Sequence, residues 1–457
     1  MQGNPTSMRV PDPGIGALFT LEARWQAWLD VEAALAWAEA ELGIVPEAAA
    51  AEIERKARLE LLDRGRIDEG LRRTAHQLVP LIWELARVCE GDAGNYVHWG
   101  ATTQNIVQTG ELLLLKRVHR IILGQLGGVL AAMAELAERS AEMVLPGRTH
   151  GQHAVPATFG LKVATWIDEL IRHQERLRQA EPRVFVAMLG GAAGTVASFG
   201  AHGLKVQEAL ARRLEMGSMT VPSRAQGDQQ AEYVVLLGLL AATQSKIARE
   251  IFTLMMQEFG EVEEPVPPGT VGSSTMPQKR NPFLSQDVIA MAAELRALVP
   301  LALEGMQVEN EADRKYMLML RRALIQACTL TGDMLARLEM LMRGLVLKPE
   351  RMRANLDLGG GLIMAEPVML ALGEHIGRQA AHDVVYDAAQ AAATGDKAFV
   401  ELLAGDARVT RHLTAERIAA LSDPAAYTGM SAELARSQAK RARDVAAALD
   451  LQVSSTP

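Results

Sequence analysis

A polar segment, GSSTMPQKRNP at residues 272–282, interrupts a largely apolar chain and contains residue types that could do chemistry. Gly272 frees the backbone ahead of two serines, and two prolines restrict φ further along. The pattern predicts a loop that presents hydroxyl groups, Lys279 and Asn281, and that can close over a ligand. The plainer interpretation is a solvated loop that caps the next helix, and composition alone leaves both interpretations open.

A second polar segment, PGRTHGQH at residues 146–153, places two histidines just ahead of a long helical pattern. We interpret its first residues as a Pro-Gly turn, with His150 and His153 behind that turn. A histidine can transfer protons near neutral pH because its unperturbed pKa lies there. The segment therefore predicts a site at which a histidine moves a proton.

A third polar segment, HWGATTQN at residues 98–105, supplies two adjacent hydroxyl groups, those of Thr102 and Thr103. Both threonines lie near an expected helix start, where unpaired backbone N–H groups are available. Hydroxyl and N–H donors at a helix N-terminus suit a carboxylate. We therefore expect this segment to bind an acidic group.

The elements that must position these segments are predicted to be helices. Of the 457 residues, 49% are hydrophobic and only 4% aromatic, and few stretches have the period of two that strands require. Apolar positions at helical spacing predict an early helix over residues 17–41. Longer apolar segments, which we expect to form a bundle buried on several sides, cover residues 111–144, 159–181, 229–262 and 285–345. Pro300 is expected to end or kink the last of these. The predicted fold class is all-α.

The expected organisation is an N-terminal helical domain over residues 1–110, a central long-helix bundle over 111–355 and a C-terminal helical domain over 356–457. A net charge of −8 argues against a nucleic-acid partner, which usually selects clustered basic residues. The start of the chain shows no secretory signal, and no stretch of about 18 uninterrupted apolar residues predicts a membrane span. Two widely separated cysteines, Cys89 and Cys328, are expected to be reduced core residues of a cytoplasmic protein.

The first segment closely resembles the signature GSSxMPxKxNP of the fumarase/aspartase superfamily, which includes adenylosuccinate lyase, argininosuccinate lyase and 3-carboxy-cis,cis-muconate cycloisomerase. GRTHGQHAVPATFG and HWGATTQNIVQT are similar to two further conserved regions of that superfamily, and the resemblance covers most of the chain. GGAAGT at residues 190–195 resembles a turn beside the bound substrate, although close helix packing would explain it equally well. The resemblance implies a helical homotetramer in which each active site collects the three segments from three different chains.

The resemblance also implies roles for individual residues. Ser273 would be the base that removes a proton next to a carboxylate, and Lys279 would stabilise the resulting charge. His150 would position the substrate or relay a proton to the leaving group. The implied substrate-binding residues are Thr102, Thr103, Thr149, Gln152, His153, Lys279, Asn281 and His76. No cofactor is implied, and no Cys/His spacing suggests a metal.

Within the superfamily the chain looks most like 3-carboxy-cis,cis-muconate cycloisomerase, because of HWGAT, GLIMAE and DPAAYTG. Several positions depart from that pattern. His150 is a lyase-like feature, and Gln286 replaces a glutamate that closes the signature in many lyases. Asn105 and Gln108 stand where acidic residues are usual. The SSxER run with which adenylosuccinate lyases commonly bind a nucleotide phosphate is missing from QVENEADRKYMLML.

These features leave the fate of the carbanion open. The leading hypothesis is a cycloisomerase or lyase that acts through an aci-carboxylate on a small di- or tricarboxylate. Alternatives are a C–N lyase that releases fumarate from an N-substituted aspartate, and an epimerase of an aminodicarboxylate such as iminodisuccinate. A catalytically inactive structural relative is disfavoured, because Ser273, Lys279, Asn281 and His150 are all present.

Overall fold

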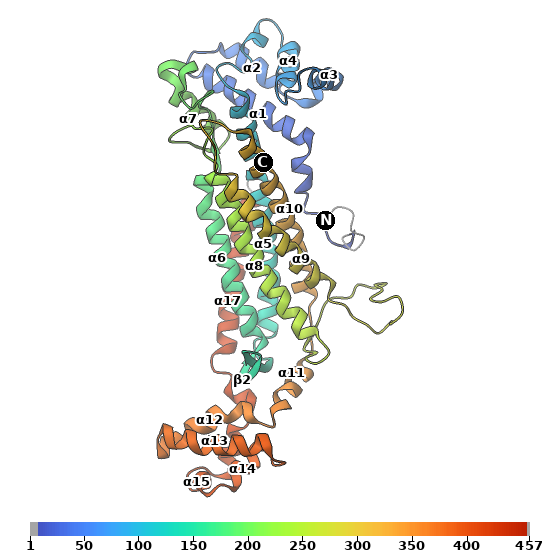
Figure 1. Ribbon diagram of the computed structural model, residues 1–457, viewed down its shortest axis with the longest axis vertical. Coiled ribbons are helices and arrows are strands. Elements are labelled where there is room, and N and C mark those ends of the chain that lie inside the picture. The colour runs from blue at the N-terminus through green and yellow to red at the C-terminus, as the bar shows by residue number, and fades with distance from the viewer. Residues whose placement is uncertain (1–7, 455–457) are drawn as a thin grey trace. The chain divides into compact units, whose positions relative to one another are not determined.

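The computed structural model describes residues 8–454, and almost all of its regular structure in this range is helical (Figure 1). The prediction of an all-α protein is confirmed. The first seven residues, on which part of the expectation of no secretory signal depends, lie outside the described range. Long helices and short connecting strands therefore position the polar segments.

The helices differ widely in length, from four residues in α15 to 37 in α5. The α-helices are α1 (Leu21–Ala40), α2 (Glu47–Lys56), α3 (Arg64–Thr74), α4 (Val79–Val88), α5 (Thr103–Arg139), α6 (Phe159–Val184), α7 (Gly203–Arg213), α8 (Asp228–Met255), α9 (Phe283–Glu304), α10 (Arg314–Gly344), α11 (Pro349–Leu356), α12 (Ala365–Ile376), α13 (Arg378–Thr394), α14 (Phe399–Gly405), α15 (Ala407–Thr410), α16 (Ala415–Leu421) and α17 (Ser431–Ser454). Strands occur only as short pairs in the described residues: β1 (Val144–Thr149) with β2 (Gln152–Thr158), β3 (Val186–Ala187) with β4 (Gly217–Ser218), and β5 (Val262–Glu263) with β6 (Val346–Leu347).

The chain divides into two compact units, each built from three separate stretches of sequence. The first unit contains residues up to 125, 173–242 and 291–336, and the second contains residues 126–172, 243–290 and 337–457. The segment at residues 98–105 belongs to the first unit. The segments at 146–153 and 272–282 belong to the second.

The predicted early helix is confirmed as α1. The Thr20 hydroxyl caps it by accepting the Ala23 N–H at 3.2 Å. The indole rings of Trp25 and Trp28 are buried, as their helical spacing predicts. A Cβ at Gly110 would lie 2.6 Å from Cδ1 of Trp28, so only glycine lets α5 approach α1 this closely.

The long helices are confirmed with corrected ends. α5 begins at Thr103, earlier than the predicted residue 111, because the polar segment before it provides the cap. The segment at 285–345 forms two helices, α9 and α10, and the break between them lies after Glu304 instead of at Pro300. Pro300 does not end α9, which continues to Glu304. Near the C-terminal end of α9, a proline removes only one of the last intrahelical hydrogen bonds.

By length and composition alone, α5 contains a window apolar enough to cross a membrane, and 61% of that window is buried inside the protein. The core helix of a non-membrane protein passes the same test. α5 therefore gives only weak support for a membrane span.

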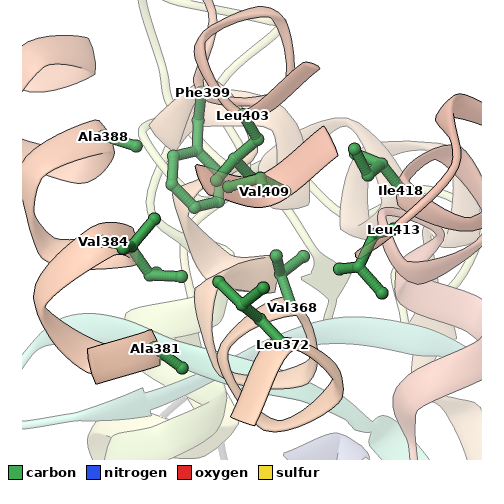
Figure 2. Close-up of a cluster of buried hydrophobic side chains, with 11 residues drawn as sticks. Val368, Leu372, Ala381, Val384, Ala388, Phe399, Leu403, Val409, Leu413 and Ile418 are labelled. Atoms are coloured by element: carbon green, nitrogen blue, oxygen red, sulfur yellow. The ribbon is translucent and has the colours of Figure 1, made fainter. Parts of the chain in front are cut away.

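The C-terminal helices of the second unit have a hydrophobic core of their own. Figure 2 shows its side chains, which converge from α12, α13 and α14 and from the segment that follows. Phe399 of α14 is 1% exposed, and Val368 and Leu372 of α12 are fully buried. Burying a side chain of this size stabilises a fold by roughly 1.5–3 kcal/mol. This core lets α12–α16 fold around their own contacts.

Candidate active site

The segment at 272–282 forms a loop between β5 and α9, and the loop has a fixed base. The Glu264 carboxylate accepts the N–H groups of Leu284 at 2.9 Å and Ser285 at 2.8 Å, in the first turn of α9. Burial raises the pKa of Glu264, although these hydrogen bonds oppose the shift. The start of α9 is therefore held against the strand that enters the loop.

The loop also closes on itself. The Asn281 side-chain amide donates to the Gly272 carbonyl at 2.5 Å. A Cβ at Gly272 would lie 2.2 Å from the Lys279 carbonyl oxygen, so only glycine fits at this position. Asn281, which sequence analysis assigns to a carboxylate, is thus partly used to hold the loop in this structure.

Ser273 is half-buried in the loop, and its hydroxyl oxygen accepts two backbone N–H groups. These come from Thr275 at 3.3 Å and Met276 at 3.0 Å. N–H donors that point at an oxygen stabilise negative charge on it. The Ser273 alkoxide is therefore more stable in this geometry than the alkoxide of a serine that only contacts solvent. The neighbouring Ser274 is exposed.

Lys279 is exposed and lines an open groove of about 870 Å³. Met276, Arg280 and Lys348 also line this groove, whereas Ser273 does not. The Arg280 guanidinium lies 3.6 Å from the Glu263 carboxylate. The loop therefore does not bring the Lys279 ammonium to the Ser273 hydroxyl in the described conformation.

The segment at 146–153 is a β-hairpin, which corrects the prediction of a Pro-Gly turn. Pro146 lies inside β1, beside an irregularity in the pairing, and Thr149 pairs with Gln152. The two residues of the turn are His150, with φ of 53°, and Gly151, with φ of 76°. Positive φ at both positions is the requirement of a type I′ hairpin turn. His150 is therefore an exposed residue at the hairpin tip in a conformation that non-glycine residues rarely adopt.

A buried ion pair joins this hairpin to the strand that leads into the signature loop. The Arg148 guanidinium donates to the Glu261 carboxylate at 3.1 Å and 2.5 Å, and the Asn355 amide donates to it at 2.8 Å. Glu261 is fully buried. Burial and the charge of Arg148 lower the pKa of His153, so this half-buried ring is neutral near pH 7.

The hairpin and the loop share this support, but their predicted site residues do not touch. Among the described residues, no hydrogen bond joins His150 or Thr149 to Ser273, Lys279 or Asn281. Gln152 is exposed beside the turn. The second unit therefore holds two sets of site residues on one anchored framework.

In the first unit, Thr102 and Thr103 lie at the start of α5, as predicted. The Asn105 side-chain oxygen accepts the Thr102 N–H at 3.0 Å, as in a capping box. Asn105 and Gln108 are 1% and 4% exposed, and Gln108 accepts from the Gln104 amide at 3.1 Å. Uncharged amides thus replace the usual acids at buried positions where they cap and brace the helix start.

His76 meets the same helix start. Its Nδ1 accepts the N–H groups of Leu78 at 3.3 Å and Val79 at 3.1 Å, at the start of α4. In a neutral ring the proton must then be on Nε2, which lies 3.3 Å from the Thr103 hydroxyl oxygen. The structure therefore brings together His76 and Thr103, which are 27 residues apart in the sequence.

A buried acid, Glu32, holds the beginning of this segment and was missed from the sequence. Its carboxylate lies 2.7 Å from Nδ1 of His98, whose φ is 64°. Burial acts to lower the pKa of His98, but the charge and hydrogen bond of Glu32 outweigh it and the pKa is raised. The available signal was an acidic residue within the apolar face of α1.

Sequence analysis also missed Glu261 and Arg224. Glu261 could have been sought because Arg148, directly before Thr149, needs a counter-charge if it is buried. Arg224 is the single basic residue of the loop at residues 219–227, and its guanidinium donates to the Gln104 side chain at 2.7 Å. Neither residue belongs to a motif that a pattern would single out. Within the described residues, no group of three or more His, Cys, Asp or Glu side chains could hold a metal ion.

Comparisons with known proteins agree with this framework. The family model described as Lyase matches residues 7–296, and one described as Adenylosuccinate lyase C-terminus matches residues 361–437. An adenylosuccinate lyase of Methanothermobacter thermautotrophicus is 38% identical, over 93% of this chain and 96% of that protein. A 3-carboxy-cis,cis-muconate cycloisomerase of Pseudomonas aeruginosa is 39% identical, over 91% of each chain. The crystal structure of a fumarate lyase from Mesorhizobium sp. BNC1 matches with a TM-score of 0.87 and 34% identity, over 94% of this chain and 98% of that one.

Proposed function

This chain belongs to the lyase family of the fumarase/aspartase superfamily and is an enzyme of that superfamily, and from this premise we propose how it acts. It removes a proton from the carbon next to a carboxylate of a small di- or tricarboxylate. The electron pair of the broken C–H bond moves into the carboxylate and gives an aci-carboxylate dianion. The observation that carries the proposal is the Ser273 hydroxyl oxygen, which accepts two backbone N–H groups.

Ser273 is the proposed base. A serine hydroxyl is a weak base in water, and it becomes effective only as an alkoxide stabilised by donors in a site that excludes water. The N–H groups of Thr275 and Met276 supply two such donors. Closure of the exposed loop over the substrate would remove water and carry the Lys279 ammonium toward the developing charge.

The remaining site residues are assigned to the substrate. Carboxylates are held by Thr102, Thr103, Thr149 and Asn281, with Gln152, His153, Lys279 and His76 as further contacts. Asn281 keeps a second N–H for this purpose, because its amide nitrogen has two hydrogens and one is used by Gly272. His76 can donate through Nε2 while its Nδ1 remains bound to α4.

The preferred reaction is that of a 3-carboxy-cis,cis-muconate cycloisomerase. In the lactone-opening direction the carbanion expels the carboxylate oxygen of the lactone. In the closing direction a carboxylate oxygen adds to the C=C bond, and the carbanion that this addition forms is then protonated. Similarity to the Pseudomonas aeruginosa cycloisomerase supports this choice. A carboxylate is a stable leaving group and needs no proton as it departs. The reaction therefore does not require a general acid to protonate the leaving group.

The second candidate is a C–N lyase that releases fumarate from an N-substituted aspartate, and His150 favours it. A departing amine needs a proton, and a histidine at an exposed hairpin tip can deliver one. An epimerase, which would return the proton to the opposite face of the carbon, needs no leaving group at all. These three outcomes share the same carbanion.

We infer a homotetramer whose active sites combine residues of different subunits, as membership of the fumarase/aspartase superfamily implies. If the enzyme releases an amine, so that His150→Asn and Ser273→Ala are both inactive, the two variants should regain partial activity when they are mixed and reassembled. A stable, active monomer in sedimentation would contradict this assembly. We also expect a cytoplasmic location, because both cysteines are free.

The reaction is tested by following ultraviolet absorbance while carboxymuconate, adenylosuccinate and simple N-substituted aspartates are offered separately. The preferred function predicts turnover of carboxymuconate alone. In addition, His150→Asn, which tolerates the left-handed conformation, should slow amine release by about 10² or more but leave a lactonisation nearly unchanged. Turnover of an aspartate derivative with this His150 dependence would favour the lyase, and no turnover of any acid would contradict both.

A further inference from the structure

Arg224 is a half-buried cation without an acidic partner. It lies in the loop between β4 and α8, where its Nε donates to the Gln104 side-chain oxygen at 2.7 Å and its Nη1 to the Ala192 carbonyl at 2.7 Å. Among the described residues, no carboxylate lies within ion-pair distance of this guanidinium. No protein acceptor in the same range meets Nη2.

Both acceptors lie in segments assigned to the substrate. Gln104 follows Thr103 at the start of α5, and Ala192 belongs to the glycine-rich turn at residues 190–195. That turn packs tightly against the loop of Arg224, since a Cβ at Gly190 would lie 1.8 Å from the Pro222 carbonyl oxygen. Arg224 thus connects the carboxylate-binding threonine segment with the glycine-rich turn.

Arg224 lacks the acidic partner that some other arginines of the same unit have. Arg183 pairs with Glu232, and Arg321 pairs with Glu111. Burial lowers the pKa of Arg224, because partial removal from water disfavours the charged form and no acid compensates for it. A partly buried guanidinium without an acidic partner attracts an anion, and the geometry of its planar N–H groups fits the two oxygens of a carboxylate.

We propose that Arg224 binds a substrate carboxylate beyond those held by Thr102, Thr103 and Asn281, so that the enzyme prefers acids with at least three carboxylates. This inference rests on the proposed function, which places substrate carboxylates at the start of α5. It narrows the substrate class within that function. Arg224 then determines specificity and takes no part in proton removal.

The test uses equilibrium binding to the full-length Ser273→Ala protein, in which turnover does not interfere. Calorimetry compares propane-1,2,3-tricarboxylate with glutarate, which lacks the central carboxylate. Arg224→Met should weaken tricarboxylate binding by about tenfold or more, the usual effect of losing a charged hydrogen bond, and glutarate binding by less than about twofold. Arg224→Lys should recover part of the loss, because it keeps the charge without the planar fork. Arg183→Met, which removes the same charge from an ordinary ion pair, should change neither affinity.

Equal weakening of both acids by Arg224→Met would overturn the proposal and assign Arg224 to bracing Gln104 and Ala192. Unchanged tricarboxylate binding would also overturn it. A larger loss for adenylosuccinate than for the tricarboxylate would identify a phosphate as the ligand and reject the carboxylate. Failure of glutarate to bind the protein with Arg224 intact would instead refute the carboxylate site of the proposed function, and this inference with it.

Discussion

The segment at residues 98–105 and the loop at residues 272–282 are both polar interruptions of an apolar chain, but the protein holds them in opposite ways. The first is embedded. Asn105 caps Thr102, Glu32 holds His98, and His76 meets Thr103. The second is exposed over most of its length, and apart from its base it is held mainly by its own hydrogen bonds.

The two ways of holding a segment suit two different tasks, substrate binding and proton removal. Groups that bind a carboxylate work best when they are positioned before the substrate arrives, since no ordering is then needed. A serine base requires water to be excluded, which an exposed loop can achieve only by closing after the substrate has bound. We therefore expect the embedded segment to control affinity and the loop to control the rate.

The largest effect is expected for the loop. Ser273→Ala should lower kcat by about 10² to 10⁴, the usual contribution of general acid–base catalysis, while substrate affinity changes little. Rapid kinetics and calorimetry on the same substrate would measure both quantities. Ser274→Ala is the matched control and should have a milder effect. Near-normal turnover of Ser273→Ala would remove the serine base and turn attention to His150 and His153.

The next largest effect is expected for the buried ion pair between Arg148 and Glu261, which supports the loop. Glu261→Gln leaves the buried Arg148 without its counter-charge, so the free energy of unfolding should fall by about 3–5 kcal/mol. Glu263→Gln, which affects only partly exposed pairs with Arg280 and Lys348, should cost less than about 1 kcal/mol. Urea denaturation would compare the two variants. Similar losses for both would mean that the hairpin and the loop do not depend on the buried pair.

Helix α1, whose Glu32 holds the embedded segment, should show a pH-dependent stability. Burial, with the nearby charge of Glu32, raises the pKa of Glu39 to about 9. The unfolded chain ionises Glu39 near its ordinary value of 4.5, so ionisation favours unfolding increasingly between pH 4.5 and 9. Glu39→Gln should abolish this loss, and its stability advantage should grow by at most about 1.4 kcal/mol per pH unit.

Urea denaturation of the wild-type and Glu39→Gln proteins at pH 5, 6.5 and 8 measures this dependence. The variant should have nearly wild-type stability at pH 5 and a clear advantage at pH 8. A constant difference across the three values would show that Glu39 titrates normally. Glu32→Gln should reduce the shift, since it removes the neighbouring charge.

The smallest effect concerns exposure of the loop. Trypsin should cleave after Lys279 and Arg280 in the free enzyme, and fumarate should slow this cleavage several-fold if the loop closes over a carboxylate. Cleavage at Lys397, in the exposed connection between α13 and α14, should not respond to fumarate. Mass spectrometry of early fragments would follow both sites. Equal protection at both sites would show a general effect of fumarate on the protease.

Local patterns made much of the fold predictable. Helical spacing around Trp25 and Trp28 located α1, and the expected helix start near Thr102 and Thr103 agrees with α5, which begins at Thr103. Breaks inside long apolar runs were harder to locate, because a proline such as Pro300 can lie in the last turns of a helix that continues. The helix ends instead just before Gly305, where an added Cβ would lie 2.8 Å from Cγ of Leu320.

Candidate site residues could be proposed from the sequence only where chemistry and motif coincide, as at Ser273 and His150, and their roles stay predictions. The supports of the site could not, because Glu261 pairs with Arg148 and Arg224 with Gln104, each more than 100 residues away in the sequence. The hairpin turn was misplaced for a related reason. Pro146-Gly147 is a common turn signal, but positive φ at His150 and Gly151 decides where the chain reverses.

The two cysteines make this enzyme convenient for spectroscopic labelling. Burial raises the pKa of the half-buried Cys89 thiol to about 11, and the pKa of the fully buried Cys328 thiol is raised as well. Maleimides react with thiolates, so the native protein should label slowly at neutral pH. A single cysteine introduced at exposed Met276 would then carry a fluorophore selectively. Such a probe would report loop movement in real time without removal of either natural cysteine.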